Sequence, residues 1–230
     1  MPFFYYYDPT YALVIIALLL SMFASFGVKA TFSKYNKVSN TRGLTGADAA
    51  RQILNANGLS AVRLERVSGQ LTDHFDPKSN VVRLSDSTYS STSVGAIGVA
   101  AHECGHAIQY AVGYIPIKIR NKIVPVVNIG NSLAMPLFLL GLILGIYNLA
   151  LFGAALFGVV LAFQIITLPV EFNASRRAIK ILDERQVLAD NELKGAKKVL
   201  KAAAMTYVAA VLATALQLLR LLMIVNRRRD

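Results

Sequence analysis

Four long apolar runs dominate the pattern of hydrophobic and polar positions along the chain. They cover residues 11–28, 129–149, 150–170 and 202–225, and they hold few or no charged side chains. Because about 20 apolar residues in a helix cross the roughly 30 Å hydrocarbon core of a bilayer, each run predicts a membrane-spanning helix. The fourth run is the least regular, since Gln217 lies inside it and Arg220 lies near one end. An arginine there can extend its charge to the interface.

The first run has an alternative interpretation as a secretory signal peptide. The preceding residues, MPFFYYYDPT, contain no lysine or arginine, and no clear small-residue cleavage site follows the run. A retained membrane anchor is therefore favoured. The cluster Tyr5–Tyr7 suits an aromatic belt at the membrane interface.

The polar segment 29–128 predicts a small folded part between the first two apolar runs. The stretch TGADAARQILNANG (45–58) begins with a capping threonine, has apolar residues at helical spacing and ends at a glycine, which predicts a helix. AVRLERV, QLTDHF and VVRLS have strand patterns separated by turn residues, which predicts a small hairpin or meander. A helical pattern resumes over 93–113. The expected fold class is mainly α and membrane-integrated, with about four transmembrane helices and a small α+β part.

The second polar segment, 171–201, contains the charged stretch DERQVLADNELKGAKKVLK over 183–201. This composition predicts a solvated helix in which Glu192 pairs with nearby lysines. No chemistry is expected from it.

The net charge of +11 is distributed around the apolar runs. The flanking positive residues are Lys29, Lys34, Lys37, Arg42, Lys118, Arg120, Lys122, Arg176, Arg177 and Lys180. By the positive-inside rule they predict that 29–128 and 171–201 face the cytoplasm, although the terminal NRRRD would then lie outside, against the rule. A nucleic-acid partner is not expected, because no aromatic-basic interleaving or binding motif accompanies the charge. The single cysteine excludes an internal disulfide and fits a reducing compartment.

Two of the three histidines stand in the stretch HECGH inside the predicted helix 93–113. His102 and His106 lie four residues apart and therefore share one helix face, from which both can bind one metal ion. Glu103 is rotated by about 100°, which suits a general base acting on a metal-bound water. Cys104 is expected to be a small buried residue on the opposite face, and Gly105 predicts a close backbone approach. The alternative is a helix that buries two hydrogen-bonded histidines.

A catalytic zinc ion takes three protein ligands and one water. His74, in LTDHFDP, is one candidate for the third ligand, and acids beyond the hairpin are others. Glu171 is the better candidate, because it follows the third apolar run, where the chain returns to the side of His106.

The stretch AAHECGHAIQ, followed by a hydrophobic hairpin and PVEFNASRRA, resembles the bacterial membrane zinc metallopeptidases of the YugP type. It is more distantly similar to the HtpX and CAAX-prenyl protease families. The YugP-type likeness covers nearly the whole chain, including FDPKSNVVRLS and LKGAKKVLKAAAMTYVAA. The resemblance implies that His102, His106 and Glu171 bind one zinc ion and that Glu103 activates the water.

One departure concerns the support of a histidine. The HtpX-like families usually place an aspartate four residues after the third ligand, where this chain has Ser175. Asn173 and Asp183 are alternatives for that role, and the sequence does not choose between them.

The implied reaction is metal-assisted peptide hydrolysis, in which a further donor stabilises the developing oxyanion. His74, Tyr89 and Tyr207 are candidates for this donor, with His74 ranked first because histidine is rare in the chain. The segment NVVRLS is either an ordinary strand or a free edge that holds an extended peptide substrate.

The sequence thus predicts a zinc-dependent endopeptidase in the bacterial cell membrane, with several spans and a cytoplasmic active site. Its partners would be the lipid bilayer and a protein or peptide substrate in or near the membrane, and its oligomeric state is not predicted. One alternative is an inactive zinc-binding adaptor or chaperone-like protein, which the intact Glu103 disfavours. A lipid or ion transport protein is disfavoured by the lack of charges deep in the first three runs.

Overall fold

The computed structural model describes residues 8–227, which form two compact units. The apolar unit comprises the described residues of Met1–Ala24, Lys122–Ile166 and Tyr207–Asp230, and the sheet unit comprises Ser25–Asn121 and Thr167–Thr206. The cluster Tyr5–Tyr7 and the last three residues of the NRRRD tail lie outside the described residues.

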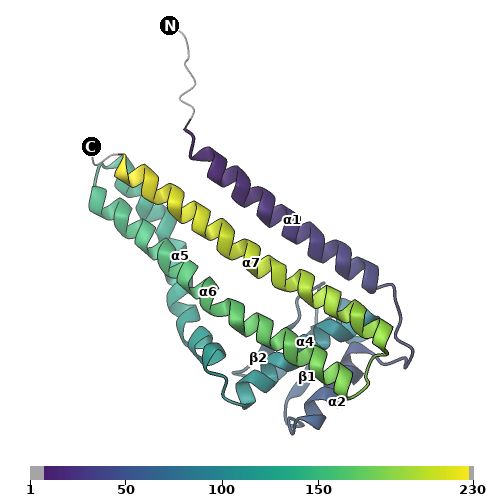
Figure 1. Cartoon of the computed structure of the whole chain (residues 1–230). Coiled ribbons are helices and arrows are strands. Elements are labelled where there is room, and N and C mark those ends of the chain that lie inside the picture. The colour runs from purple at the N-terminus through teal and green to yellow at the C-terminus, as the bar shows by residue number, and fades with distance from the viewer. Residues whose placement is uncertain (1–7, 228–230) are drawn as a thin grey trace. The chain divides into compact units, whose positions relative to one another are not determined.

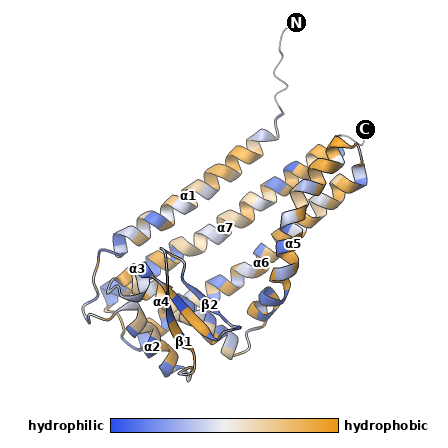
Figure 2. Cartoon of the chain, turned by 180° about the vertical axis from the view of Figure 1, so that it is seen from behind, coloured by the Kyte–Doolittle hydropathy of each residue, from blue (hydrophilic) through white to orange (hydrophobic). Residues whose placement is uncertain are grey.

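Four long helices account for most of the chain and confirm the mainly α, membrane-integrated fold class. They are α1 (Tyr11–Tyr35), α5 (Ile115–Ile143), α6 (Tyr147–Glu184) and α7 (Asp190–Asn226). All four are long and apolar enough to cross a membrane. The helices α1, α6 and α7 also extend beyond their apolar runs, and Figure 2 shows hydrophobic residues along most of α1 giving way to hydrophilic ones. The run 129–149 does not form one helix, because α5 ends at Ile143 and α6 begins at Tyr147.

The apolar unit has its own small core. Phe138 of α5, Ala150 and Ala154 of α6, and Leu221 and Val225 of α7 are buried together. At Gly153 of α6, an added Cβ would lie 2.7 Å from the backbone oxygen of Ala134 on α5, so the glycine allows these two helices to approach closely.

The start of α1 and the end of α7 are joined within this unit by polar contacts. Asp8 pairs with Arg227 at 3.0 Å, and the Arg220 guanidinium lies 4.8 Å from the centroid of the Tyr11 ring. The arginine inside the fourth apolar run therefore makes a cation–π contact, which offsets part of the cost of placing its charge there.

The sheet unit contains the shorter elements, in the order α2 (Gly46–Ala56), β1 (Arg63–Val67), β2 (His74–Asp76), β3 (Val81–Ser85), α3 (Asp86–Tyr89) and α4 (Val94–Ala111). The helices predicted over 45–58 and 93–113 are both present. Thr45 and Asp48 form a capping box at the start of α2, and the Ser93 side chain caps α4. These local signals explain why both starts were predictable.

The three strands form one sheet in the order β1-β3-β2. β2 and β3 are antiparallel, as a hairpin requires, but β1 pairs with β3 in parallel, so the alternative of a meander is wrong. The strand β3 takes the central position because four of its five residues are buried, whereas no residue of β1 is fully buried. NVVRLS is therefore not a free edge for substrate, because β3 is paired on both sides.

The contacts of Glu192 differ from the prediction that it pairs with nearby lysines. Its side chain is 4% exposed and accepts hydrogen bonds from the backbone N–H groups of Thr41, at 2.7 Å, and Ala189, at 2.9 Å. It does not pair with lysines as expected. A carboxylate in the first turn of a helix accepts hydrogen bonds from N–H groups that would otherwise be unpaired. The Glu192 carboxylate also links the loop after α1 to the start of α7 through its hydrogen bond with Thr41.

The helix α4 lies in the middle of the sheet unit, with α2 and the sheet against it (Figure 1). Its small residues make this burial possible. At Gly105, an added Cβ would lie 2.6 Å from the backbone oxygen of Ala174 on α6, which confirms the predicted close approach. This contact sets α6 directly beside the HECGH stretch.

Candidate metal centre

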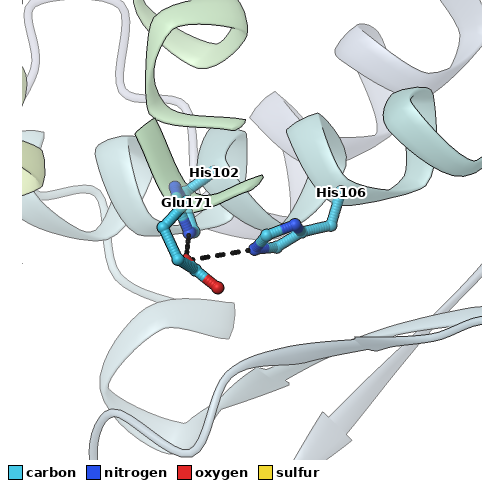
Figure 3. A group of neighbouring side chains, drawn as sticks. All are labelled: His102, His106 and Glu171. Atoms are coloured by element: carbon cyan, nitrogen blue, oxygen red, sulfur yellow. Dashed lines mark hydrogen bonds and ion pairs between the residues drawn. The ribbon is translucent and has the colours of Figure 1, made fainter. Parts of the chain in front are cut away.

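Three side chains from α4 and α6 converge in the sheet unit: His102, His106 and Glu171 (Figure 3). The Nε2 atoms of His102 and His106 lie 3.2 and 3.5 Å from the Oε2 atom of Glu171. One ligand atom from each residue can be chosen so that all three lie within 4.8 Å of one another. The structure thus brings together the three residues predicted as zinc ligands, from positions as much as 69 residues apart.

The local sequence explains this convergence. The four-residue spacing puts both histidines on the same face of α4, with ring centroids 4.7 Å apart. Gly105 admits the backbone of α6, and Glu171 lies on α6 one turn before the point of contact. Glu171 is only 2% exposed, so its carboxylate needs partners that compensate for the loss of water.

Gln109 fixes the orientation of His106. Its Nε2 donates to the backbone oxygen of Val170 at 2.8 Å and to Oδ1 of Asn173 at 3.0 Å. Because a carbonyl oxygen can only accept, this identifies the amide nitrogen and leaves Oε1 to face His106 Nδ1 at 3.0 Å. The Nδ1–H therefore donates to Gln109, and the lone pair of Nε2 is directed to the candidate centre.

Ser175 supports the other histidine. Its hydroxyl lies 3.1 Å from Nδ1 of His102, so this residue, rather than Asn173 or Asp183, contacts the ring at the position where the HtpX-like families usually have an aspartate. A hydroxyl both donates and accepts, whereas an ionised carboxylate only accepts. Ser175 can therefore support either neutral tautomer of His102.

Arg120 is a member of the site that the sequence analysis treated only as a membrane-flanking charge. Its Nη1 lies 3.1 Å from Oε1 of Glu171, close enough for an ion pair although not aligned as a hydrogen bond. The arginine comes from the first turns of α5, and no spacing rule connects it to Glu171. Gln109 was also missed, although a polar residue three positions after His106 on a buried helix is a usable signal.

Glu103 is 8% exposed, and its environment differs from that of Glu171. Burial, opposed by the nearby His102 ring and assisted by the carboxylates of Glu171 and Asp73, raises the pKa of Glu103 to about 7. The backbone of Phe75 on β2 also lies near this carboxyl group and lowers its pKa. The residue predicted as general base is thus buried near the candidate ligands His102 and Glu171.

Cys104 points away from this cluster, as predicted. Its side chain is fully buried, and its Sγ lies 3.6 Å from the backbone oxygen of Ala50 on α2. Burial raises the pKa of the thiol, which disfavours the thiolate that binds metals.

The structure gives no support to the predicted oxyanion donors. His74 is exposed and its Nδ1 donates to the backbone oxygen of Thr72 at 2.9 Å. The next residue, Phe75, packs on the core, so the alternation along β2 turns His74 away from α4. Tyr89 packs against the core of the sheet unit, and Tyr207 belongs to the apolar unit.

The donor set and its spacing fit a zinc ion. Zinc in proteins is bound tetrahedrally by histidine nitrogen and carboxylate oxygen at about 2.0–2.2 Å, which places neighbouring ligand atoms about 3.3–3.6 Å apart. The two distances from Glu171 to the histidines, 3.2 and 3.5 Å, are close to this spacing. Two imidazoles and one carboxylate also leave one position open, as catalytic zinc sites do.

Comparison with known proteins agrees with these features. The chain is 50% identical over 218 residues to "Putative membrane protease YugP" of Bacillus subtilis strain 168, which covers 95% of this chain and 97% of that protein. No solved structure matches significantly. The sequence signature of a family described as "Putative neutral zinc metallopeptidase" matches residues 10–226. With its four apolar helices and its His-His-Glu group, the chain therefore belongs to this family of zinc metallopeptidases, as its YugP-type resemblance indicated.

Proposed function

We propose that the chain is a membrane-embedded, zinc-dependent endopeptidase in which His102, His106 and Glu171 hold one zinc ion. The observation that carries the proposal is the meeting of two histidine nitrogens with one buried carboxylate oxygen at 3.2 and 3.5 Å. A structural zinc site is normally closed by four protein ligands. Within the described residues, the metal-binding group has three.

The residues around the centre have distinct roles in this proposal. A bound zinc ion supplies a Lewis acid that polarises the scissile carbonyl and lowers the pKa of water. Glu103 accepts the proton of the attacking water and delivers it to the leaving amine. Gln109 and Ser175 hold the two histidine rings, and Arg120 balances the charge of the buried carboxylate.

Strand β2, rather than β3, is the better place for a substrate backbone. Among the described strands β2 pairs only with β3, so it lies at an edge of the sheet. The backbone of its residue Phe75 also lies near the Glu103 carboxyl group. An extended peptide that added to this edge would lie beside the general base. The substrate in this proposal is therefore an extended segment of a membrane or membrane-proximal protein.

The active site is assigned to the cytoplasmic face. Most of the positive charges that flank the apolar runs lie in 29–128 and 171–201, and the positive-inside rule places such segments in the cytoplasm. The terminal NRRRD opposes this orientation, although the described Arg227 is paired with Asp8. Cysteine labelling from either side of membrane vesicles, at single cysteines introduced into a Cys104→Ala background, tests the orientation.

The experiment compares the full chain with its Glu103→Gln variant in a mild detergent. Zinc content is measured for both proteins, together with cleavage of an unfolded model protein such as casein. We expect equal, stoichiometric zinc in both and internal cleavage only by the wild type, because glutamine keeps the shape of the side chain but cannot accept the proton. Equal zinc with cleavage by neither would favour the adaptor alternative, and cleavage by the variant at the wild-type rate would remove Glu103 from the mechanism.

A further inference from the structure

A pocket outside the candidate metal centre lies in the sheet unit between the end of α1 and the start of α7. Its volume is about 490 Å³. Three lysines line it: Lys34 from α1, and Lys198 and Lys201 from α7. The rest of the lining is mainly apolar and includes Ala202 and Met205. The pocket therefore combines three positive charges with a hydrophobic wall.

The packing of Tyr35, at the end of α1, against α7 shapes this pocket. Gly195 of α7 has no side chain, and an added Cβ would lie 2.7 Å from the ring of Tyr35. The tyrosine ring therefore rests against α7 and forms one wall of the pocket. The ammonium group of Lys34 lies 5.8 Å from the centroid of the same ring.

The lysines lie at the polar ends of two membrane helices. Lys34 follows the apolar run of α1, and Lys198 and Lys201 precede the apolar run that begins at Ala202 on α7. By the assignment of these runs to the membrane, all three charges belong at the level of the lipid headgroups, whereas Met205 lies one turn further into the apolar run.

These positive charges are not balanced by acidic residues on the same helices. The sequence of α1 contains no aspartate or glutamate, and the acidic residues of α7 are Asp190 and Glu192. Glu192 is buried and bonded to backbone N–H groups. All three lysines are exposed, so their charges are open to an anion from outside the protein.

We infer that this pocket binds the headgroup of an anionic phospholipid, with the phosphate between the three lysines and the start of an acyl chain against Met205 and its apolar neighbours. Basic pockets between membrane helices on the cytoplasmic side bind such headgroups. The apolar wall distinguishes this occupant from a free phosphate ion, which gains nothing from contact with methionine or alanine. The inference does not depend on the peptidase activity.

The test measures lipid retention by the full chain with native mass spectrometry. The protein is purified in a neutral detergent and titrated with phosphatidylglycerol, phosphatidylcholine or soluble glycerol phosphate. The test variant is Lys198→Gln with Lys201→Gln. The matched control is Lys194→Gln with Lys197→Gln, which removes the same charge from exposed positions of the same helix that do not line the pocket.

We expect the wild type and the control to retain phosphatidylglycerol in preference to phosphatidylcholine. A lysine near an anionic lipid surface contributes a factor of about five in affinity, so the test variant should bind phosphatidylglycerol about 25-fold more weakly. The variant Lys198→Arg with Lys201→Arg, which keeps the charge, should retain it. Equal losses in test and control variants, no preference for the anionic lipid, or equally tight binding of glycerol phosphate would each overturn the inference.

Discussion

Replacing Gln109 with methionine should weaken zinc binding as well as destabilise the fold. Gln109 is fully buried, so no water can take the place of its amide group. The substitution leaves the Nδ1–H of His106 without its acceptor, whereas the Asn173 oxygen keeps its bond to Arg177 at 2.8 Å. One buried donor without a partner costs about 1–3 kcal/mol. Loss of the group that orients a metal-binding histidine typically costs about 10–100-fold in metal affinity.

The assay is zinc competition against chelators of graded affinity, with thermal unfolding measured on the same samples. Gln109→Glu keeps an acceptor for His106 and should bind zinc more tightly than Gln109→Met. Asn40→Leu is the matched control, because Asn40 is also buried and bonded to backbone oxygens, but away from the candidate centre. It should lower the unfolding temperature and leave zinc affinity unchanged. Wild-type zinc affinity in Gln109→Met would show that this hydrogen bond does not prepare the site.

Three further substitutions test other parts of the structure. Ser175→Ala should reduce zinc affinity, measured by chelator competition, by about tenfold or more, while Ser175→Asp should retain it. Equal zinc affinities of Ser175→Ala and the wild type would show that the hydroxyl does not support the site. Gly105→Ala should destabilise the fold by about 1–3 kcal/mol, because the added Cβ meets the backbone of α6. Gly27→Ala is the control and should not destabilise it, because an added Cβ there has nothing within 4 Å. Equal unfolding temperatures of the two variants would contradict this reasoning. Arg120→Gln leaves the buried Glu171 without its cation, so added zinc should raise the unfolding temperature more in this variant than in the wild type.

The predictable parts of the fold are those that depend on local sequence. The apolar runs, the capping threonine at the start of α2 and the glycine at its end, Gly58, act within a few residues of themselves. The position of β1 was not predictable in this way. Its parallel pairing with β3 depends on which strand is buried in the folded unit, and not on neighbouring residues. Glu192 was wrongly expected to face lysines, since its backbone partner Thr41 is 151 residues away.

The candidate site also combines residues that local sequence predicts with residues whose contacts depend on tertiary packing. The helical spacing placed His102 and His106 on one face, and the return of the chain after two apolar runs pointed to Glu171. The contacts of Gln109 and Arg120 depend on how α4, α5 and α6 pack, which composition does not reveal. The roles of these residues in zinc binding and hydrolysis remain predictions.

X-ray absorption at the zinc edge of the purified full chain would test most directly whether His102, His106 and Glu171 bind a zinc ion. We predict one zinc ion per chain, bound by two histidine nitrogens and by oxygen ligands at about 2.0–2.2 Å, with no sulfur in its first coordination shell. The Glu171→Gln variant should lose most of its zinc or change the oxygen contribution. A sulfur ligand at about 2.3 Å would point to Cys104, and a wild-type chain free of zinc after metal loading would contradict the proposed metallopeptidase site.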